Sequence, residues 1–559
     1  MYGGTDYRIF ERGRGMSGKI QVLDCTLRDG AYVVNAKFGE PAMRGIIKKM
    51  QDANIDIVEC GWLKDTPHEP GTSYFHVPSD LEQYLVRKNP NTTYVVMIDW
   101  DRYNLDTLPP CDGKSIDAIR VVFPQNKFRE GIAKGKIIQE KGYKVYFQAA
   151  NTLGYTDEEL VSLAEAVNEA RPVSLSVVDT FGAMFSEDLS HIVTILNQHL
   201  NPEIRLGFHS HNNQQLSFAM SMEFVRMLAE TKRDIVVDAS LCGMGRGAGN
   251  TTTELMANYL NSKWQANYNM NVIMDAIDMY MGYFTERYKW GYSIPYFISG
   301  MYCAHVNNIA YLTENHRTNA GDMRNIIESL SEEERKKYDY DLLEEKYIDY
   351  QSKKVDDEAF LRRFEQELKD RKILLLLPGK SLLEKEADIK AYIEKYHPVV
   401  IGINAISKQY SYDYLFFSNS IRYEYAKDVY SDIFQANRRI VASNIKTVPE
   451  DGEDIVNFNL LVERGWEHFD NSGIVCLRLL NRVHAAEVAL AGFDGFSDEY
   501  SESYADVSLP HLNPGKKWGE LNDEIKDMFR HFREKTAGDM SVGFVTESKY
   551  MDESEKIND

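Results

Sequence analysis

Two histidines one residue apart are the residues in this sequence most suited to chemistry. His209 and His211 follow residues 204–208, a mostly apolar run that is typical of a strand. Side chains at positions i and i+2 of an extended backbone point the same way, so both imidazoles can face one point. Two imidazoles at one point favour a divalent metal site, with incidental histidines at a surface strand end as the alternative.

The histidines end one of eight short β-branched runs that alternate with segments of helical period. The runs are 20–24, 57–61, 94–99, 118–123, 144–149, 175–179, 205–209 and 235–239, and the helical segments between them include 41–53, 157–170 and 214–228. Eight strands separated by helices over roughly 250 residues predict a (β/α)8 TIM barrel. An open doubly wound sheet would favour a glycine-rich turn after the first strand, where Cys25-Thr-Leu-Arg-Asp-Gly30 stands instead.

Polar groups collect at the carboxyl ends of the predicted strands, where the active site of such a barrel lies. They are Arg28, Asp29, Glu59, Gln148, Asn151, Asp179, Thr180, His209, His211, Asn250 and Glu254. Asp29 would add a carboxylate to the two imidazoles and leave coordination sites for a bidentate oxygen ligand. The alternative for Arg28 and Asp29 is a local ion pair that caps a loop.

A metal at this rim would act as a Lewis acid on the carbonyl of a 2-oxo acid, which chelates through carboxylate and keto oxygens. Breaking the adjacent C–C bond leaves negative charge on that oxygen, which the Arg28 guanidinium would stabilise. The glycine-rich stretch 243–250 could bring backbone amides close to an anion, or only supply turns. Asn250 could be a further oxygen ligand, or the N-cap of a helix beginning near Thr251.

Three motifs stand in order at the predicted strand ends: Leu23-Asp-Cys-Thr-Leu-Arg-Asp-Gly30, Gly207-Phe-His-Ser-His-Asn-Asn213 and Val237-Asp-Ala-Ser-Leu-Cys-Gly-Met-Gly-Arg-Gly-Ala-Gly-Asn250. They resemble those of the DRE-TIM metallolyases, the HMGL-like family of hydroxymethylglutaryl-CoA lyase, isopropylmalate and citramalate synthases, and 4-hydroxy-2-oxovalerate aldolase. The third motif with Glu254, and Gly291-Tyr-Ser-Ile-Pro-Tyr296 with His305, are most similar to the aldolase branch. The resemblance covers about residues 19–310.

The resemblance implies a divalent metal, usually manganese or magnesium, held by Asp29, His209 and His211. Asn250, suggested by its position in the loop, is the further candidate ligand. It implies that Arg28 is catalytic and contacts the substrate. The other substrate contacts that it implies are Thr180, His209, Tyr292 and Tyr296.

The catalytic position two residues after Gly30 departs from the aldolase pattern. The aldolases carry a histidine there, whereas this chain has Tyr32. A tyrosine with its reference pKa near 10 is a poor general base at neutral pH unless the metal or Arg28 lowers it. The base or the substrate is therefore expected to differ, or the activity to be reduced.

The rest of the chain predicts three further parts after a barrel domain at 19–265. They are a helical segment packing on the barrel at 266–315, a charged helical linker at 316–372, and a Rossmann-like α/β domain of unknown role at 373–545. Pro378-Gly-Lys-Ser381 resembles a phosphate-binding loop, but Leu374 stands where a Walker loop needs glycine, which favours a plain strand-to-helix turn. Residues 471–476 and 490–496 faintly resemble Rossmann-like domains of bacterial surface-glycan synthesis.

Composition narrows the partners and the compartment. The 85 acidic and 64 basic residues give a formal charge of −21, which argues against nucleic acid and anionic membranes as partners. Six scattered cysteines without a CxxC pair favour free thiols, and no apolar run reaches membrane-spanning length. The polar N-terminus is not typical of a signal peptide. We therefore expect a cytoplasmic protein, with a homo-oligomer or a partner enzyme as open possibilities.

The leading hypothesis is a class II, metal-dependent aldolase or lyase that makes or breaks a C–C bond next to a 2-oxo acid such as pyruvate. One alternative is a Claisen-type acyl-CoA condensing synthase, although the C-terminal half does not look like the regulatory domain of those synthases. The other is a non-catalytic barrel scaffold in surface-glycan metabolism, which Tyr32 favours and the charged cluster of Arg28, Asp29, His209 and His211 opposes.

Overall fold

The computed structural model describes residues 18–85, 87–229, 231–316, 318–351, 355–445, 452–468, 470–499, 502–510 and 517–551. The chain divides into two units, Met1–Val306 and Asn307–Asp559, which are described separately. Across these described ranges, no helix combines the length and the apolar character that crossing a membrane requires.

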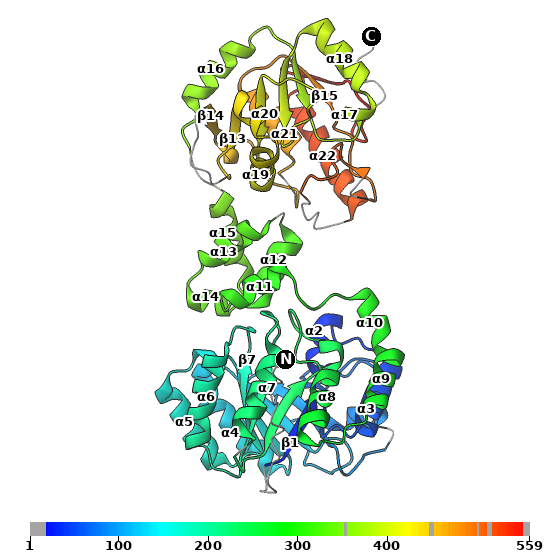
Figure 1. The fold of residues 1–559 in the computed structure, drawn as a ribbon, viewed down its shortest axis with the longest axis vertical. Coiled ribbons are helices and arrows are strands. Elements are labelled where there is room, and N and C mark those ends of the chain that lie inside the picture. The colour runs from blue at the N-terminus through cyan, green and yellow to red at the C-terminus, as the bar shows by residue number, and fades with distance from the viewer. Residues whose placement is uncertain are drawn as a thin grey trace, which may run out of the picture. The chain divides into compact units, whose positions relative to one another are not determined.

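Eight parallel strands of the first unit form a closed ring (Figure 1). They are β1 (Ile20–Asp24), β2 (Ile57–Leu63), β4 (Thr93–Asp99), β5 (Ala118–Phe123), β6 (Lys144–Ala149), β7 (Ser174–Asp179), β8 (Arg205–Ser210) and β9 (Ile235–Ala239). Each strand pairs with the next in this order, and β1 pairs with both β9 and β2, which closes the barrel. The predicted TIM barrel is confirmed. A two-residue strand that the sequence did not predict, β3 (Tyr74–Phe75), pairs with β2 outside the ring.

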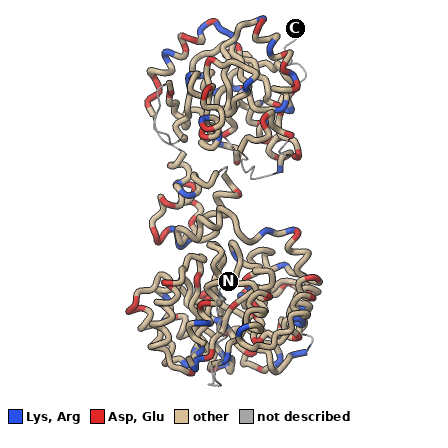
Figure 2. The backbone as a smooth tube through the Cα atoms, viewed as in Figure 1, with Lys and Arg blue, Asp and Glu red and all other residues tan. Residues whose placement is uncertain are grey.

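Amphipathic helices surround the barrel because one face of each carries an apolar stripe. They are α3 (Glu40–Asp52), α4 (Phe128–Glu140), α5 (Asp157–Ala170), α6 (Ser186–His199), α7 (Ser217–Leu228) and α8 (Thr253–Trp264). In α5 the stripe is Leu160, Leu163, Ala164 and Val167, and a capping box between Thr156 and Glu159 starts the helix. Acidic and basic residues are mixed along the outer helices (Figure 2).

Short helices follow β1 and α8. Directly after β1 come α1 (Thr26–Asp29) and α2 (Ala31–Val34). After α8 the chain forms α9 (Met270–Ala276), the π-helix η5 (Ile277–Met281), α10 (Gly282–Arg287) and α11 (Ile294–Met301). A Cβ atom added to Gly300 of α11 would lie 3.2 Å from the Asn213 side chain and 3.2 Å from the Gly182 carbonyl. Helix α11 therefore packs on the loops that follow β7 and β8.

The second unit begins with helices and continues as an open parallel sheet. The helices are α12 (Val306–Asn315), which starts at the last residue of the first unit, α13 (Ala320–Glu328), α14 (Glu332–Lys336), α15 (Tyr340–Gln351) and α16 (Glu358–Leu368). The sheet has the order β14 (Glu453–Val456), β13 (Arg438–Ala442), β12 (Tyr414–Phe417), β11 (Val399–Ile403), β10 (Ile373–Leu376), β15 (Glu487–Ala491) and β16 (Ser541–Phe544). The predicted second α/β sheet is confirmed, while β14 and β16 were not predicted.

Both faces of this sheet are buried. Ile373 and Leu375 of β10 pack in one apolar cluster with α16, α21 (Ser472–Arg482) and α22 (Trp518–Lys535). Leu374 and Leu376 point the other way and pack in a second cluster with α18 (Glu386–Tyr396). Burial on both faces explains the unbroken apolar run at the start of this domain.

Candidate metal centre and active site

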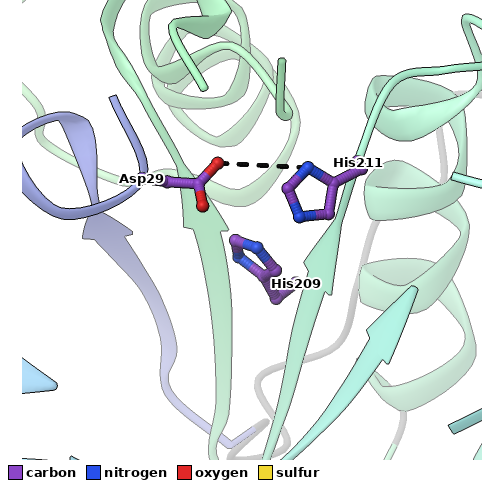
Figure 3. A group of neighbouring side chains, drawn as sticks. All are labelled: Asp29, His209 and His211. Atoms are coloured by element: carbon purple, nitrogen blue, oxygen red, sulfur yellow. Dashed lines mark ion pairs between the residues drawn. The ribbon is translucent and has the colours of Figure 1, made fainter. Parts of the chain in front are cut away.

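Three residues with metal-binding side chains converge at the carboxyl end of the barrel. Asp29 comes from α1, His209 from the end of β8 and His211 from the residue that follows β8. One ligand atom from each lies within 4.8 Å of the others, and all three side chains are buried. Figure 3 shows the Asp29 carboxylate and both imidazole rings directed toward a common point. Since β8 lies next to β9 and β9 next to β1, closure of the barrel brings these residues together.

Asp29 and His211 have the protonation states that bind metal. Burial raises the pKa of Asp29, but Arg28 and the two histidines outweigh it and hold that pKa well below its ordinary value. Burial lowers the pKa of His211 to about 4. At neutral pH the group therefore offers an ionised carboxylate and a neutral imidazole, as metal coordination requires.

Asp238 of β9 orients the first histidine. The Nδ1 atom of His209 donates to Asp238 Oδ2 over 3.0 Å, which leaves Nε2 as the ring atom available to a metal. A carboxylate behind a metal-binding histidine fixes its tautomer and ring orientation. Asp238 thus supports the metal group without belonging to it.

Asn250 lies beside Asp29 and has one hydrogen-bond acceptor atom without a partner among the described residues. Its Nδ2 atom donates to Asp29 Oδ2 over 2.7 Å, while its Oδ1 atom is buried and has no hydrogen-bond partner within the described residues. A buried acceptor without a partner costs about 1–3 kcal/mol, which a metal at this position would offset. Helix α8 begins at Thr253 with Thr252 as its N-cap, so the N-cap interpretation of Asn250 is wrong. The residues present therefore fit a divalent metal.

The glycine-rich loop after β9 lies directly over the Asp29 carboxylate. The backbone N–H of Arg246 donates to Asp29 Oδ2 over 3.1 Å. A Cβ atom on Gly245 would collide with that same oxygen and with Asn250 Nδ2. Of the two interpretations of this loop, close approach of a backbone amide to an anion is the one that the geometry supports.

Arg28 belongs to a buried ionic chain that extends across the barrel interior. Its Nη1 atom lies 2.6 Å from Asp29 Oδ1, and its Nε atom lies 2.8 Å from Glu59 Oε2. Arg120 of β5 lies 2.8 Å from the same Glu59 oxygen and also pairs with Asp238. The Arg28–Asp29 pair is therefore not an isolated loop cap. It is one end of a series of ion pairs that runs from Asp29 to Asp238, the hydrogen-bond partner of His209.

Arg120 and Asp238 were absent from the predicted site. A signal for them was present, because each is a charged residue inside an otherwise apolar strand, and such residues are rarely buried without a partner. Glu59 was predicted at the rim and is fully buried. These three residues hold Arg28 and His209 in position.

Tyr32 of α2 lies at the edge of this site in aromatic surroundings. Its ring makes an edge contact with Trp62 at a centroid distance of 6.1 Å, and the Arg246 guanidinium lies 4.6 Å from its centroid. Desolvation raises the pKa of Tyr32 to about 12, although Arg246 and Arg28 act in the opposite direction. Arg28 and Arg246 therefore do not by themselves bring the pKa of Tyr32 below its ordinary value. The phenol holds its proton at neutral pH.

The remaining predicted residues lie farther along the rim. Thr180, after β7, accepts a hydrogen bond from the Asn151 backbone N–H over 2.7 Å. The side chain of Tyr292 is 58% exposed in the loop before α11, and Tyr296 is half-buried in the first turn of α11. The structure thus gathers Arg28, Asp29, His209, His211 and Asn250 into one group, with Tyr32 at its edge.

The sequence of the barrel is similar to those of known proteins. The profile of the HMGL-like family matches residues 126–279. The chain is 30% identical over 272 residues to 4-hydroxy-2-oxovalerate aldolase of Pseudoalteromonas translucida, covering 46% of this chain and 75% of that protein. It is 25% identical over 264 residues to oxaloacetate decarboxylase of Mycobacterium tuberculosis, covering 46% of this chain and 74% of that protein. A crystal structure of Bacillus subtilis HMG-CoA lyase aligns with a TM-score of 0.40 and 16% identity, over 48% of this chain and 95% of that one. The chain belongs to the HMGL-like family, the DRE-TIM metallolyases that its three motifs resemble.

Proposed function

We propose that the barrel is a divalent-metal-dependent carbon–carbon lyase that acts on 2-oxo acids and passes through the enolate of pyruvate. The observation that carries the proposal is the buried group of Asp29, His209 and His211, joined directly to Arg28. The named relatives, an aldolase of 4-hydroxy-2-oxovalerate and an oxaloacetate decarboxylase, both act on 2-oxo acids. Mn²⁺ and Mg²⁺ are the metals that we expect, because carboxylate, imidazole and amide oxygen ligands suit them.

Asp29, His209 and His211 would hold the metal, with Asn250 Oδ1 as a further oxygen ligand. Bound there, the metal would supply Lewis-acid polarisation of the substrate carbonyl. Glu59 and Asp29 fix the Arg28 guanidinium from two sides, so that Arg28 can stabilise negative charge on the carbonyl oxygen without reorganising. Thr180, Tyr292 and Tyr296 remain the proposed substrate contacts on the rim.

Tyr32 favours decarboxylation as the specific reaction. Aldol cleavage requires a base that removes the hydroxyl proton, whereas decarboxylation of a 2-oxo diacid requires only a proton donor for the enolate carbon. With its pKa raised to about 12, Tyr32 is suited to donate a proton and unsuited to remove one. We therefore infer that oxaloacetate is a better substrate than 4-hydroxy-2-oxovalerate.

The first experiment measures metal content and enolisation together. Purified protein is assayed for bound Mn²⁺ or Mg²⁺, and pyruvate is followed by NMR for exchange of its methyl protons with solvent deuterium. We expect one metal per chain and metal-dependent exchange, slowed at least about tenfold in Arg28→Lys because lysine cannot make both guanidinium contacts. Metal-free protein without exchange would leave the scaffold hypothesis standing, and acetyl-CoA-dependent condensation would favour the Claisen synthase.

The second experiment compares the two reactions in wild type and Tyr32→Phe. Oxaloacetate decarboxylation is expected to slow about 10–100-fold in the variant while metal content is unchanged, because a proton donor contributes roughly that factor or more. Tyr74→Phe is the control, at a half-buried tyrosine that pairs with Trp62, the residue whose ring Tyr32 contacts. Equal rates in wild type and Tyr32→Phe would remove Tyr32 from the mechanism, and faster aldol cleavage than decarboxylation would reverse the substrate preference.

We also infer a reducing, cytoplasmic location. All six cysteines are free thiols, and Cys25, Cys60 and Cys476 are buried. A fusion to a fluorescent reporter in the native host would test this, and export of the fusion would contradict it.

A further inference from the structure

The sheet of the second unit has a point at which its strand order reverses. From β10 the chain adds β11, β12, β13 and β14 in one direction, and then crosses to the other side of β10 to form β15 and β16. All the pairings are parallel. In open parallel sheets of this kind, ligands bind outside the carboxyl ends of the strands at such a reversal. The reversal here lies between β10 and β15.

A cavity of about 100 Å³ lies at this point. It is lined by the loops after β10, β11 and β15 and by the first residues of α21. A larger cavity of about 340 Å³ shares Pro378 with it. Its lining combines apolar side chains and two tyrosines with four polar or charged residues, Ser407, Lys408, Gln409 and Asp506. At roughly 10–15 Å³ for each water, the smaller cavity has room for a tetrahedral oxyanion and the larger one for an organic group.

The lining of the smaller cavity carries positive charge and hydrogen-bond donors. The Arg422 side chain of α19 (Ser420–Val429) lines it, is only 2% exposed, and lies 4.8 Å from the Tyr504 ring centroid. At the start of α21, Asn471 accepts from the Ile474 N–H, while Ser472 and Gly473, which hold the preceding N–H groups, line the cavity. A guanidinium beside a helix N-terminus is a combination that binds phosphate.

A cluster of hydroxyl and amide groups lies at this helix start. The Ser472 hydroxyl accepts from Asn404 Nδ2, and it also accepts from the Ser418 hydroxyl over 2.9 Å. The carboxylate among the lining residues is Asp494, which accepts from the Ser381 N–H over 2.7 Å and from its hydroxyl over 2.5 Å. Asp494 is therefore engaged with the Pro378-Gly-Lys-Ser381 turn.

That turn is not a phosphate loop. A Cβ atom on Gly379 would collide with the Gly492 carbonyl and with Asp494, so this glycine lets two loops pack together. A single glycine after β10 also differs from the three-glycine fingerprint of dinucleotide sites. We propose that the crevice between β10 and β15 binds a small phosphorylated metabolite, with the phosphate between Arg422 and the start of α21 and the organic part toward the larger cavity.

Calorimetric titration of the full chain tests this site, with a chelator present so that the barrel metal does not contribute. The probes are inorganic phosphate, AMP as a phosphate ester with a planar ring, and acetate. Wild type is expected to bind phosphate and AMP saturably, and AMP at least tenfold more tightly, while acetate binds at least tenfold more weakly than phosphate. Absence of saturable phosphate and AMP binding, or acetate binding as tight as phosphate, would overturn the proposal.

Ser472→Asp is the most informative variant, because an acidic residue in the first turn suits the helix dipole while repelling an anion. We expect an unchanged or higher unfolding temperature and at least tenfold weaker phosphate binding. Ser431→Asp makes the same change at the first residue of α20 (Ser431–Ala436), outside the lining, and should bind as wild type does. Arg422→Met should also weaken binding at least tenfold, whereas Ser472→Ala should stay within about threefold. Wild-type affinity in a folded Ser472→Asp or Arg422→Met protein would contradict the site.

Discussion

The barrel rim and the crevice of the second unit each lie at the carboxyl ends of the strands of their own parallel sheet, yet they differ in charge density. The rim gathers Arg28, Asp29, Glu59, Arg120 and Asp238 into one buried ionic chain. The crevice has one buried guanidinium and one carboxylate, supplemented by hydroxyls and a helix start. In a closed barrel the ends of all eight strands surround one axis, so side chains from every strand can meet there. In an open sheet only the strands on either side of the reversal in strand order bring their ends to one crevice.

This difference in charge density also affects how readily each site can be recognised from the sequence. Charged side chains that must meet inside a barrel stand at fixed places beside strands and produce motifs. A site that relies on backbone N–H groups and packing glycines leaves a fainter pattern, because many sequences supply the same backbone groups.

The largest effect is expected from Asp29→Asn. The variant loses the ionised ligand while keeping its shape, so metal content should fall below one tenth of wild type and lyase activity by at least about 1,000-fold. Metal analysis and oxaloacetate turnover measure both. Asp179→Asn is the matched control at the end of β7, and it should retain the metal. Full metal content in Asp29→Asn would place the metal elsewhere.

Arg120→Met should break the ionic chain of the barrel. Glu59 and Asp238 would then share a buried site without that guanidinium, which costs about 3–5 kcal/mol of the free energy of unfolding. Hydrogen exchange read by mass spectrometry reports each unit separately. Peptides from residues 18–306 should exchange faster, while those from the second unit stay unchanged. Arg439→Met, at a buried arginine paired with Glu453, should give the opposite pattern.

A smaller effect concerns pH. Burial raises the pKa of Asp179 to about 7, so the folded barrel holds a proton that the unfolded chain releases near pH 4. Because the folded state binds more protons over this interval, stability should fall as pH rises from about 4 to about 7. Thermal unfolding at pH 5 and pH 7.5 should show this fall in wild type and a smaller one in Asp179→Asn. An equal fall in both proteins would assign the effect to another group, such as Asp24, whose pKa burial raises to about 6.

The smallest effect is expected from Lys380→Ala in the second unit. Lys380 is exposed and does not line the cavity, so phosphate affinity should change less than twofold. In a Walker loop the corresponding lysine contacts the phosphate, and its loss would abolish binding. A loss of tenfold or more would move the proposed phosphate to the Pro378-Gly-Lys-Ser381 turn.

The sequence predicted the barrel strands to within two residues because apolar runs of the right length alternated with helical periods. It missed β3, β14 and β16, which have only two to four residues and carry little apolar signal. The motifs identified Asp29, His209 and His211. The partners of Arg120 and Asp238 required the folded structure, because they are 61 and 29 residues away along the chain. The pKa of Tyr32 depends on desolvation, which no spacing of residues reveals. The predicted domain bounds stay predictions.

Trp62 gives this active site its own optical reporter. Its indole N–H donates to the Arg28 carbonyl over 3.2 Å, its ring lies beneath the Arg28 guanidinium, and Tyr32 contacts its edge. Indole emission is sensitive to nearby charge and polarity, so ligand arrival at Arg28 should shift the fluorescence of this residue. Subtracting the spectrum of Trp62→Phe from that of wild type would isolate its emission from the other five tryptophans. Occupancy of the site could then be followed in real time without labels or turnover.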